Sequence, residues 1–138
     1  MIKVLVVDDE LPVRLVCRLN LEAEGMVVLE ASDGWAALEQ AYTGQPSIIL
    51  LDVMLPGLDG WQVADELIRD PRTGGIPIVF MSALAEFRDR AHGIGIGGVD
   101  YVTKPFDPTE LGRILRSVLE RVERGELEDL RREKLEQL

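Results

Sequence analysis

The chain has 138 residues, of which 46% are hydrophobic and 29% are charged, and its formal net charge is −10. This length and composition are typical of one domain with its own core, and no stretch approaches the roughly 20 apolar residues that span a bilayer, so we expect a cytoplasmic protein without a membrane partner. The acidic charge argues against direct nucleic-acid binding by this domain, because phosphate binding requires a cationic surface.

Short apolar runs alternate with amphipathic segments along the chain. The runs, which predict strands, are Ile2–Val7, Val27–Glu30, Ser47–Leu51, Ile76–Met81 and Val99–Thr103. The segments that predict helices are Pro12–Glu24, Trp35–Tyr42, Trp61–Arg69, Glu86–His92 and a long final helix that Asp107 caps. Strands that alternate with helices predict an α/β fold, a doubly wound five-stranded parallel sheet of flavodoxin-like order 2-1-3-4-5 with helices on both faces.

Two segments are less regular than the rest. Several glycines follow the fourth predicted helix, at Gly93, Gly95, Gly97 and Gly98, and predict that this helix is short or mobile at its end. The residues after Arg124 are mostly Glu, Arg, Lys and Leu. They predict either a helix that extends into solvent or a coiled-coil stub that pairs two chains or leads into an output domain. We therefore assign residues 1–124 to the main domain and 125–138 to a C-terminal helical extension or linker stub.

Chemically active side chains follow four of the predicted strands. The first strand precedes Asp8 and Asp9, the third precedes Asp52, the fourth precedes Ser82, and the fifth precedes Lys104. In an open parallel sheet, ligands bind in the crevice beyond the carboxyl ends of the strands. The sequence therefore predicts three carboxylates, one hydroxyl and one ammonium group around a single crevice.

This set of side chains is suited to phosphoryl chemistry. Clustered carboxylates repel one another unless a cation lies between them, and their hard oxygens favour Mg²⁺. A carboxylate such as that of Asp52 is a competent nucleophile that forms an aspartyl-phosphate. Lys104 supplies a point charge and Ser82 a hydrogen bond for the phosphoryl oxygens. The bond between Lys104 and Pro105 is a candidate cis peptide, and the sequence leaves its isomer open.

These motifs resemble the receiver domain of two-component response regulators, a family that includes the chemotaxis response regulator. The matching motifs are Val-Leu-Val-Val-Asp8-Asp9-Glu10, Leu-Leu-Asp52-Val-Met54-Leu-Pro-Gly-Leu-Asp-Gly60, Met-Ser82-Ala83 and Asp100-Tyr101-Val-Thr-Lys104-Pro105-Phe106. They occur in the family's order and spacing, and the resemblance covers residues 1–124. It implies a signalling domain that takes part in a phosphorelay.

The resemblance implies that Asp52 is the phosphoacceptor. It would take a phosphoryl group from a histidine kinase or histidine phosphotransfer protein in a reaction that requires Mg²⁺. Asp9, Asp52 and the Met54 carbonyl would bind the ion directly, and Asp8 would bind it through water. The domain would assist its own phosphorylation and dephosphorylation without being a general phosphatase or any other enzyme.

The resemblance also implies how the signal leaves the site. Lys104 and Ser82 would hold the phosphoryl oxygens, and Ser82 with Tyr101 would form a switch in which Tyr101 turns inward. The switch would change a partner-binding surface made of the fourth helix, the fifth strand and the fifth helix. If the chain forms a homodimer, we expect this surface or the C-terminal helix to mediate it.

Other classes that use similar chemistry fit the sequence less well. A haloacid dehalogenase-type phosphatase needs a second aspartate two residues after its nucleophile, where this chain has Met54. A flavodoxin-like electron carrier needs a hydroxyl- and glycine-rich phosphate loop, whereas Asp8, Asp9 and Glu10 would repel a flavin phosphate. The remaining alternative is a degenerate receiver that acts as a phosphorylation-independent interaction or dimerisation module. Whether the chain acts alone or as the N-terminal part of a longer regulator stays open.

Overall fold

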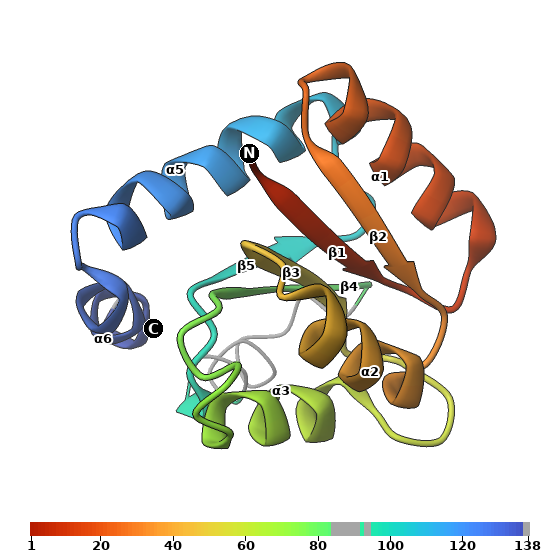
Figure 1. The fold of residues 1–138 in the computed structure, drawn as a ribbon. Helices are drawn as coiled ribbons and strands as arrows, with labels where there is room; N and C mark the ends of the chain where they lie inside the picture. The colour runs from red at the N-terminus through yellow and green to blue at the C-terminus, as the bar shows by residue number, and fades with distance from the viewer. Residues whose placement is uncertain (84–91, 93–94, 137–138) are drawn as a thin grey trace.

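A five-stranded parallel sheet forms the centre of the molecule (Figure 1). The structure is a computed structural model that describes residues 1–83, 92 and 95–136. The strands are β1 (Lys3–Val7), β2 (Val27–Ala31), β3 (Ile48–Asp52), β4 (Ile78–Ser82) and β5 (Asp100–Thr103). Their order is β2-β1-β3-β4-β5 and every neighbouring pair is parallel. The predicted doubly wound, flavodoxin-like sheet is confirmed.

Helices cover both faces of this sheet (Figure 1). They are α1 (Leu11–Ala23), α2 (Gly34–Gly44), α3 (Gly60–Arg69), α5 (Leu111–Glu123) and α6 (Leu127–Glu136), and a 3-10 turn, η1 (Pro108–Glu110), precedes α5. Helices α1 and α5 pack on one face, and α2 and α3 pack on the other. Of the predicted fourth helix, Glu86–His92, only His92 lies within the described residues. The prediction that this helix is short or mobile at its end therefore concerns residues that are largely outside the described part of the chain.

Residues of the three central strands alternate between the two faces, and almost all of them are buried. In β1, Val4 and Val6 join the core beneath α1 and α5, whereas Leu5 and Val7 join the core beneath α2 and α3. None of these four residues has exposed surface. Burial on both faces is typical of parallel sheets, and it explains why the strands occur in the sequence as almost continuous apolar runs.

Side-chain caps fix where several helices begin. Asp33 caps α2. At the start of α3, Asp59 and Gln62 form a reciprocal capping box, with hydrogen bonds of 2.9 and 3.0 Å between each side chain and the other residue's backbone N–H. Asp107 accepts a hydrogen bond from the Thr109 N–H at 3.0 Å. It caps the 3-10 turn η1 rather than a regular α-helix, so the predicted final helix begins with a tighter turn, as helix N-termini often do.

The chain turns back at Gly125, and α6 returns to the domain. Gly125 has a φ of +78°, a left-handed conformation that glycine adopts without steric cost. Leu130 of α6 is 5% exposed and belongs to the core beneath α1 and α5. The described part of the C-terminal segment therefore packs on the domain, and the expected extension into solvent is wrong for it. None of the helices in the described part of the chain combines the length and apolar character that a bilayer span requires.

Candidate functional site

Three strand ends bring two carboxylates and one ammonium group together. Asp8 follows β1, Asp52 ends β3, and Lys104 follows β5. The Nζ atom of Lys104 lies 2.6 Å from Asp8 Oδ2 and 2.9 Å from Asp52 Oδ2. Asp8 is fully buried and Asp52 is only 3% exposed. The ammonium group therefore bridges two carboxylates in a crevice that largely excludes water.

Backbone N–H groups hold the other oxygen of each carboxylate. Asp52 Oδ1 accepts a hydrogen bond from the Met54 N–H at 2.9 Å, and Asp8 Oδ1 accepts one from the Glu10 N–H at 2.8 Å. Each carboxylate thus has one oxygen fixed by its own loop and one directed at Lys104. The Met54 side chain is 60% exposed, so its link to the crevice runs through the backbone.

The loop after Asp52 returns closely over the strand end. A Cβ atom added at Gly60 would lie 2.3 Å from the Asp52 carbonyl oxygen and 2.5 Å from the Val53 Cα. The Gly60 N–H also donates to the Val53 carbonyl at 3.1 Å. No residue other than glycine fits this position without moving the backbone of Asp52 or Val53, so glycine allows the loop to pack closely over the end of β3.

The crevice perturbs the acidity of both partners of the Asp52–Lys104 pair. Burial raises the pKa of the Asp52 carboxyl to about 6, and the hydrogen bonds from the Met54 N–H and from Lys104 offset this rise only in part. Burial also disfavours the charged form of Lys104, but its hydrogen bonds to Asp8 and Asp52 outweigh that effect and raise the pKa of the ammonium group. Lys104 stays charged at neutral pH, and two carboxylates share its single positive charge.

An acidic cluster opens from the crevice toward solvent. Carboxylate oxygens of Asp8, Asp9 and Glu10 lie within 4.8 Å of one another. Asp8 is buried, whereas Asp9 and Glu10 are exposed. Glu10 was not predicted as a ligand from the sequence, although its position directly after Asp9 was an indication. An all-oxygen set with surplus negative charge is the kind of site that a hard divalent cation prefers.

Ser82 and the Lys104–Pro105 bond lie at the ends of the neighbouring strands β4 and β5. Ser82 is the last residue of β4 and is fully buried. Its carbonyl accepts a hydrogen bond from the Lys104 N–H at 2.7 Å, and the peptide bond between Lys104 and Pro105 is cis. Tyr101 lies on β5, opposite Phe80 in the sheet register, and packs partly buried against the core beneath α2 and α3.

A positively charged residue that the sequence analysis missed also supports the crevice. Arg14, in α1, donates from NH1 to the Asp8 carbonyl at 2.7 Å, and its Nε lies 3.1 Å from a carboxylate oxygen of Glu30 on β2. The side chain of Arg14 is only 15% exposed. It therefore ties the end of β1 to α1 and β2. Arg14 lies outside the motifs on which the sequence predictions were based, and no local pattern indicated this contact.

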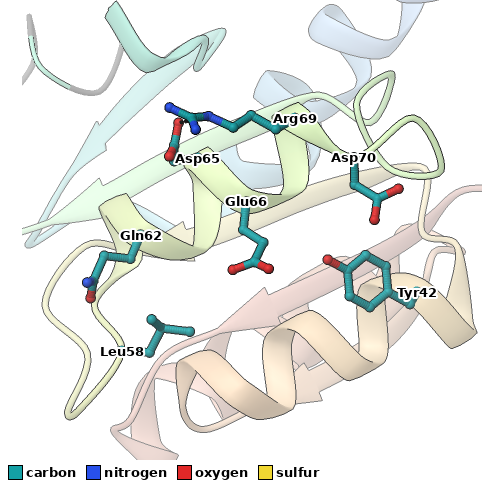
Figure 2. A pocket seen from close by; sticks show the side chains of 7 residues that line it. All are labelled: Tyr42, Leu58, Gln62, Asp65, Glu66, Arg69 and Asp70. Carbon is teal, nitrogen blue, oxygen red and sulfur yellow. Dashed lines mark hydrogen bonds and ion pairs between the residues drawn. The ribbon is translucent and has the colours of Figure 1, made fainter.

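A separate groove of about 510 Å³ lies between α2 and α3, away from the crevice (Figure 2). The residues that line it are Tyr42, Leu58, Gln62, Asp65, Glu66, Arg69 and Asp70. None of the crevice residues lines it. Arg69 is paired with Asp65 at 3.1 Å, and Arg72 lies over the Tyr42 ring and pairs with Asp70. The charges of this groove therefore largely satisfy one another, and the crevice is the better candidate for chemistry.

The chain thus has a doubly wound parallel sheet with two aspartates bridged by a lysine at its carboxyl edge. The chain belongs to the response regulator receiver family. The family model, described as "Response regulator receiver domain", matches residues 4–116. This range includes all the crevice residues described above.

Named relatives agree with this assignment. Over 122 residues the chain is 39% identical to the DNA-binding dual master transcriptional regulator RpaA of Synechocystis sp., in an alignment that covers 88% of this chain and 51% of that protein. Over 121 residues it is 42% identical to the alkaline phosphatase synthesis transcriptional regulatory protein PhoP of Bacillus subtilis, with 88% and 50% covered. The chain spans about half the length of these two relatives.

Solved structures of receiver domains also match the whole fold. The receiver domain of response regulator 1452 of Francisella superposes with a TM-score of 0.81 at 30% sequence identity. This match covers 88% of the present chain and 98% of the Francisella chain. The likeness therefore covers most of this chain and almost all of the Francisella receiver domain.

Proposed function

We propose that the chain accepts a phosphoryl group on Asp52 from a histidine kinase or a histidine phosphotransfer protein, in a reaction that depends on Mg²⁺. One observation supports this proposal above the others: the Lys104 ammonium group lies 2.9 Å from an Asp52 oxygen and 2.6 Å from an Asp8 oxygen in a buried crevice. A nucleophilic carboxylate and a fixed positive charge are the two groups that phosphoryl transfer needs most.

The residues at the crevice fit Mg²⁺. The carboxylates of Asp8, Asp9 and Glu10 lie close together, and Lys104 alone does not balance the negative charge of Asp8 and Asp52. Hard carboxylate and carbonyl oxygens are the ligands that this ion prefers. The residues that we assign to it are Asp8, Asp9, Asp52 and the backbone carbonyl of Met54. When bound, the ion would supply positive charge to the phosphoryl oxygens.

The protein's own groups define the transfer step. An Asp52 oxygen forms a bond to phosphorus while the bond between phosphorus and the donor's histidine nitrogen breaks, and the electron pair of that bond leaves with the nitrogen. The Met54 N–H holds the other Asp52 oxygen at 2.9 Å and so fixes the orientation of the nucleophile. Lys104 then neutralises a phosphoryl oxygen. The Ser82 hydroxyl, at the adjacent strand end, donates a hydrogen bond to another.

Phosphorylation would change the surface of the domain through Ser82 and Tyr101. Ser82 ends β4, and its sheet partner is Thr103, two residues after Tyr101 on β5. A displacement of Ser82 toward the phosphoryl group would therefore reach Tyr101 across one pair of strands. The surface affected would be β5 and α5, together with the predicted fourth helix, which falls largely outside the described residues. Such a switch biases two existing conformations rather than creating a new one.

An exposed apolar area of α1 is our candidate docking surface for the phosphoryl donor. Leu11, Leu15 and Val16 are 54%, 45% and 39% exposed. A neighbouring pocket of about 280 Å³ is lined by Pro12, Val13, Val16, Lys104, Pro105, Phe106 and Pro108. Apolar surface of this kind commonly marks a protein interaction site. Because Lys104 lines the pocket, a protein bound there would be close to the crevice.

The wider cellular role follows from the relatives only by analogy. The name of RpaA describes a DNA-binding regulator, but the present chain spans about half of that protein. We propose that these 138 residues act in the cytoplasm by protein contact. Because their net charge is −10, we propose that they do not bind nucleic acid directly.

Intact-mass measurement after incubation with acetyl phosphate tests the proposed function. We expect one phosphoryl adduct that requires Mg²⁺ and disappears in Asp52→Asn. Asp65→Asn, which removes a partly exposed carboxylate on α3, is the matched control and should keep the adduct. The absence of any adduct in the folded wild-type protein with Mg²⁺ would instead favour the degenerate receiver, which acts by contact alone.

A further inference from the structure

Helix α6 has a specific binding surface on the domain. Figure 1 shows α6 beyond the end of α5, at the side of the sheet where the strands begin. Leu130 is 5% exposed, and it lines one cavity together with Val99 and Val118. The apolar side of α6 therefore rests where β5 begins and α5 passes over it.

Charged and polar contacts surround this apolar centre. Arg131 donates from Nε to the Gly97 carbonyl at 2.8 Å and from NH2 to the Gly74 carbonyl at 3.2 Å. The Lys134 ammonium lies 3.6 Å from the Asp100 carboxylate. We call Gly74, Gly97, Val99, Asp100, Val118 and Arg121 together the α6 receptor surface.

Arg121 of α5 makes the main ion pairs with the helix and its turn. It donates from NH2 to Glu133 at 3.0 Å, and a second guanidinium nitrogen also pairs with that carboxylate. Its NH2 lies 2.8 Å from Glu126, the residue after Gly125. The receptor surface thus offers one cation and one anion, Arg121 and Asp100, to an anion and a cation of α6, Glu133 and Lys134. This complementarity fits an amphipathic helix of alternating charge.

The connection between α5 and α6 is a single glycine turn. The Gly125 N–H donates to the Val122 carbonyl at 2.9 Å, and the Glu126 N–H donates to the Arg121 carbonyl at 3.0 Å, which closes the end of α5. A Cβ atom at Gly125 would meet nothing within 4 Å, so only its φ of +78° requires glycine. If residue 125 became helical, α5 and α6 would form one straight helix and α6 would leave its receptor surface.

The attachment of α6 is weak compared with the core of the domain. A cavity of about 220 Å³ remains between α6, α5 and β5. Leu130 is the one buried apolar residue among the α6 residues whose side chains are described. The side chains of Arg121 and Glu133 are 26% and 42% exposed, so solvent and salt screen their pair. A helix held in this way can leave its surface while the domain stays folded.

We propose that α6 exchanges between two copies of this chain, with Gly125 as the hinge and the α6 receptor surface of each copy binding the α6 of the other. The α6 receptor surface already binds the chain's own α6. The α6 of a second copy carries the same Leu130, Glu133 and Lys134 and therefore fits the same surface. Exchange of an identical element through a short hinge is a low-cost route to a symmetric dimer. The proposal depends on α6 and not on Asp52, so it stands or falls independently of the phosphoryl chemistry.

A hinge variant tests the exchange directly. Gly125→Ala penalises the left-handed turn and favours a continuous helix, so it should raise the dimer association constant of the full chain by about tenfold or more. Gly125→Asn tolerates the left-handed conformation and is the matched control, which should behave as wild type. Sedimentation equilibrium measures the association constants, and circular dichroism checks that each variant is folded.

A pair of charge-reversal variants distinguishes exchange of α6 from any other mode of dimerisation. This test of the exchange does not require Gly125→Ala to fold. Arg121→Glu and Glu133→Arg each disrupt one pair, and neither chain alone restores it. In an exchanged heterodimer both pairs are restored, with Arg121 facing Glu133 on one side and the reversed pair on the other. The mixture should therefore form at least about threefold more dimer than either variant alone.

The outcomes separate cleanly. A hinge-dependent dimer together with a preferred heterodimer supports exchange of α6. If every folded sample stays monomeric at protein concentrations up to about 1 mM, any dimer is too weak to matter and the proposed exchange of α6 is overturned. A Gly125→Ala dimer that shows no preference for the charge-reversed mixture would overturn it equally, because the two chains would then associate through a different surface.

Discussion

At the scale of single residues, the resting crevice contains more negative charge than its lysine neutralises. Asp8 and Asp52 both contact Lys104, and both are almost fully buried. An ionised carboxylate without full compensation is costly in such surroundings, which is why the pKa of Asp52 is raised to about 6. Ionised Asp52 thus destabilises the resting fold, as expected for the nucleophile that we propose it to be.

The first prediction concerns pH. The pKa of Asp52 is about 6 in the folded protein and near its ordinary value of 3.8 in the unfolded chain, so the folded state holds its proton more tightly. Protonated Asp52 therefore contributes its full stabilisation below pH 3.8, the pKa in the unfolded chain. This stabilisation is lost as the pH rises through about 6, the pKa in the folded protein. Asp52→Asn should be more stable than metal-free wild type by an amount that grows between about pH 4 and pH 6, to at most about 3 kcal/mol.

Urea unfolding of both metal-free proteins across this pH range measures the difference. A flat Asp52→Asn difference would mean that the crevice does not disfavour the ionised carboxylate.

The second prediction concerns Lys104. Lys104→Met keeps the length of the side chain but leaves Asp8 and Asp52 buried without a counter-charge, so the free energy of unfolding at pH 7 should fall by about 3 kcal/mol without metal. This change has the opposite sign to that of Asp52→Asn. Chemical denaturation measures it, and added Mg²⁺ should restore part of the loss. An unchanged stability would contradict the buried ion-pair geometry.

The third prediction concerns Gly60. Gly60→Ala places a Cβ 2.3 Å from the Asp52 carbonyl, so the loop must shift and stability should fall by about 2 kcal/mol or more. Gly75→Ala is the matched control, because a Cβ there meets nothing within 4 Å. Thermal unfolding compares the two variants. Equal melting temperatures would show that the close approach over Asp52 is not required.

At the scale of elements, α1 has two distinct sides. Its inner side carries Arg14, which holds the Asp8 carbonyl, and Cys17, whose thiol is buried and has its pKa raised to about 12 mainly by that burial. Its outer side exposes Leu11 and Leu15 beside the pocket that Lys104 lines. The two sides of the helix therefore fit the two roles that we propose for it, support of the crevice and docking of the phosphoryl donor.

The fourth prediction separates these two roles of α1. Leu15→Glu should slow phosphoryl transfer from a histidine kinase or phosphotransfer protein by about tenfold or more, since it puts a charge into the docking surface. Phosphorylation by acetyl phosphate should stay unchanged, because a small donor needs no docking. Trp35→Glu, at a 68% exposed residue on α2, is the control. Equal slowing with both donors would place the effect in the crevice instead.

At the scale of the whole molecule, the order of the strands could be predicted from sequence because it depends on local patterns. The apolar runs, the turn residues between them and the alternation with helices define a doubly wound sheet. The positions of Asp8, Asp52 and Lys104 followed from the same reasoning, since parallel strands end at one edge. Contacts between distant segments were harder to predict. Nothing local marks the bond from Arg14 to the Asp8 carbonyl, or the cis isomer of the Lys104–Pro105 bond.

The C-terminal helix shows where prediction from sequence stops. Its leucines and alternating charges predict a helix with one apolar side, but they are equally suited to solvent, a second chain or the domain itself. The structure places Leu130 on the domain. That choice depends on Val99, Val118 and Arg121, which lie far away or on another helix, and on the turn at Gly125.

The most direct test of the central claim is to locate the phosphoryl group itself. After incubation with acetyl phosphate and Mg²⁺, borohydride reduces an acyl phosphate to an alcohol, and peptide mass mapping then identifies the modified side chain. We predict a single modified residue, Asp52, within the peptide that spans β3 and the following loop. Modification of Asp8 or Asp9 instead, or an unmodified Asp52 in a protein that carries phosphate, would contradict the proposed role of this crevice.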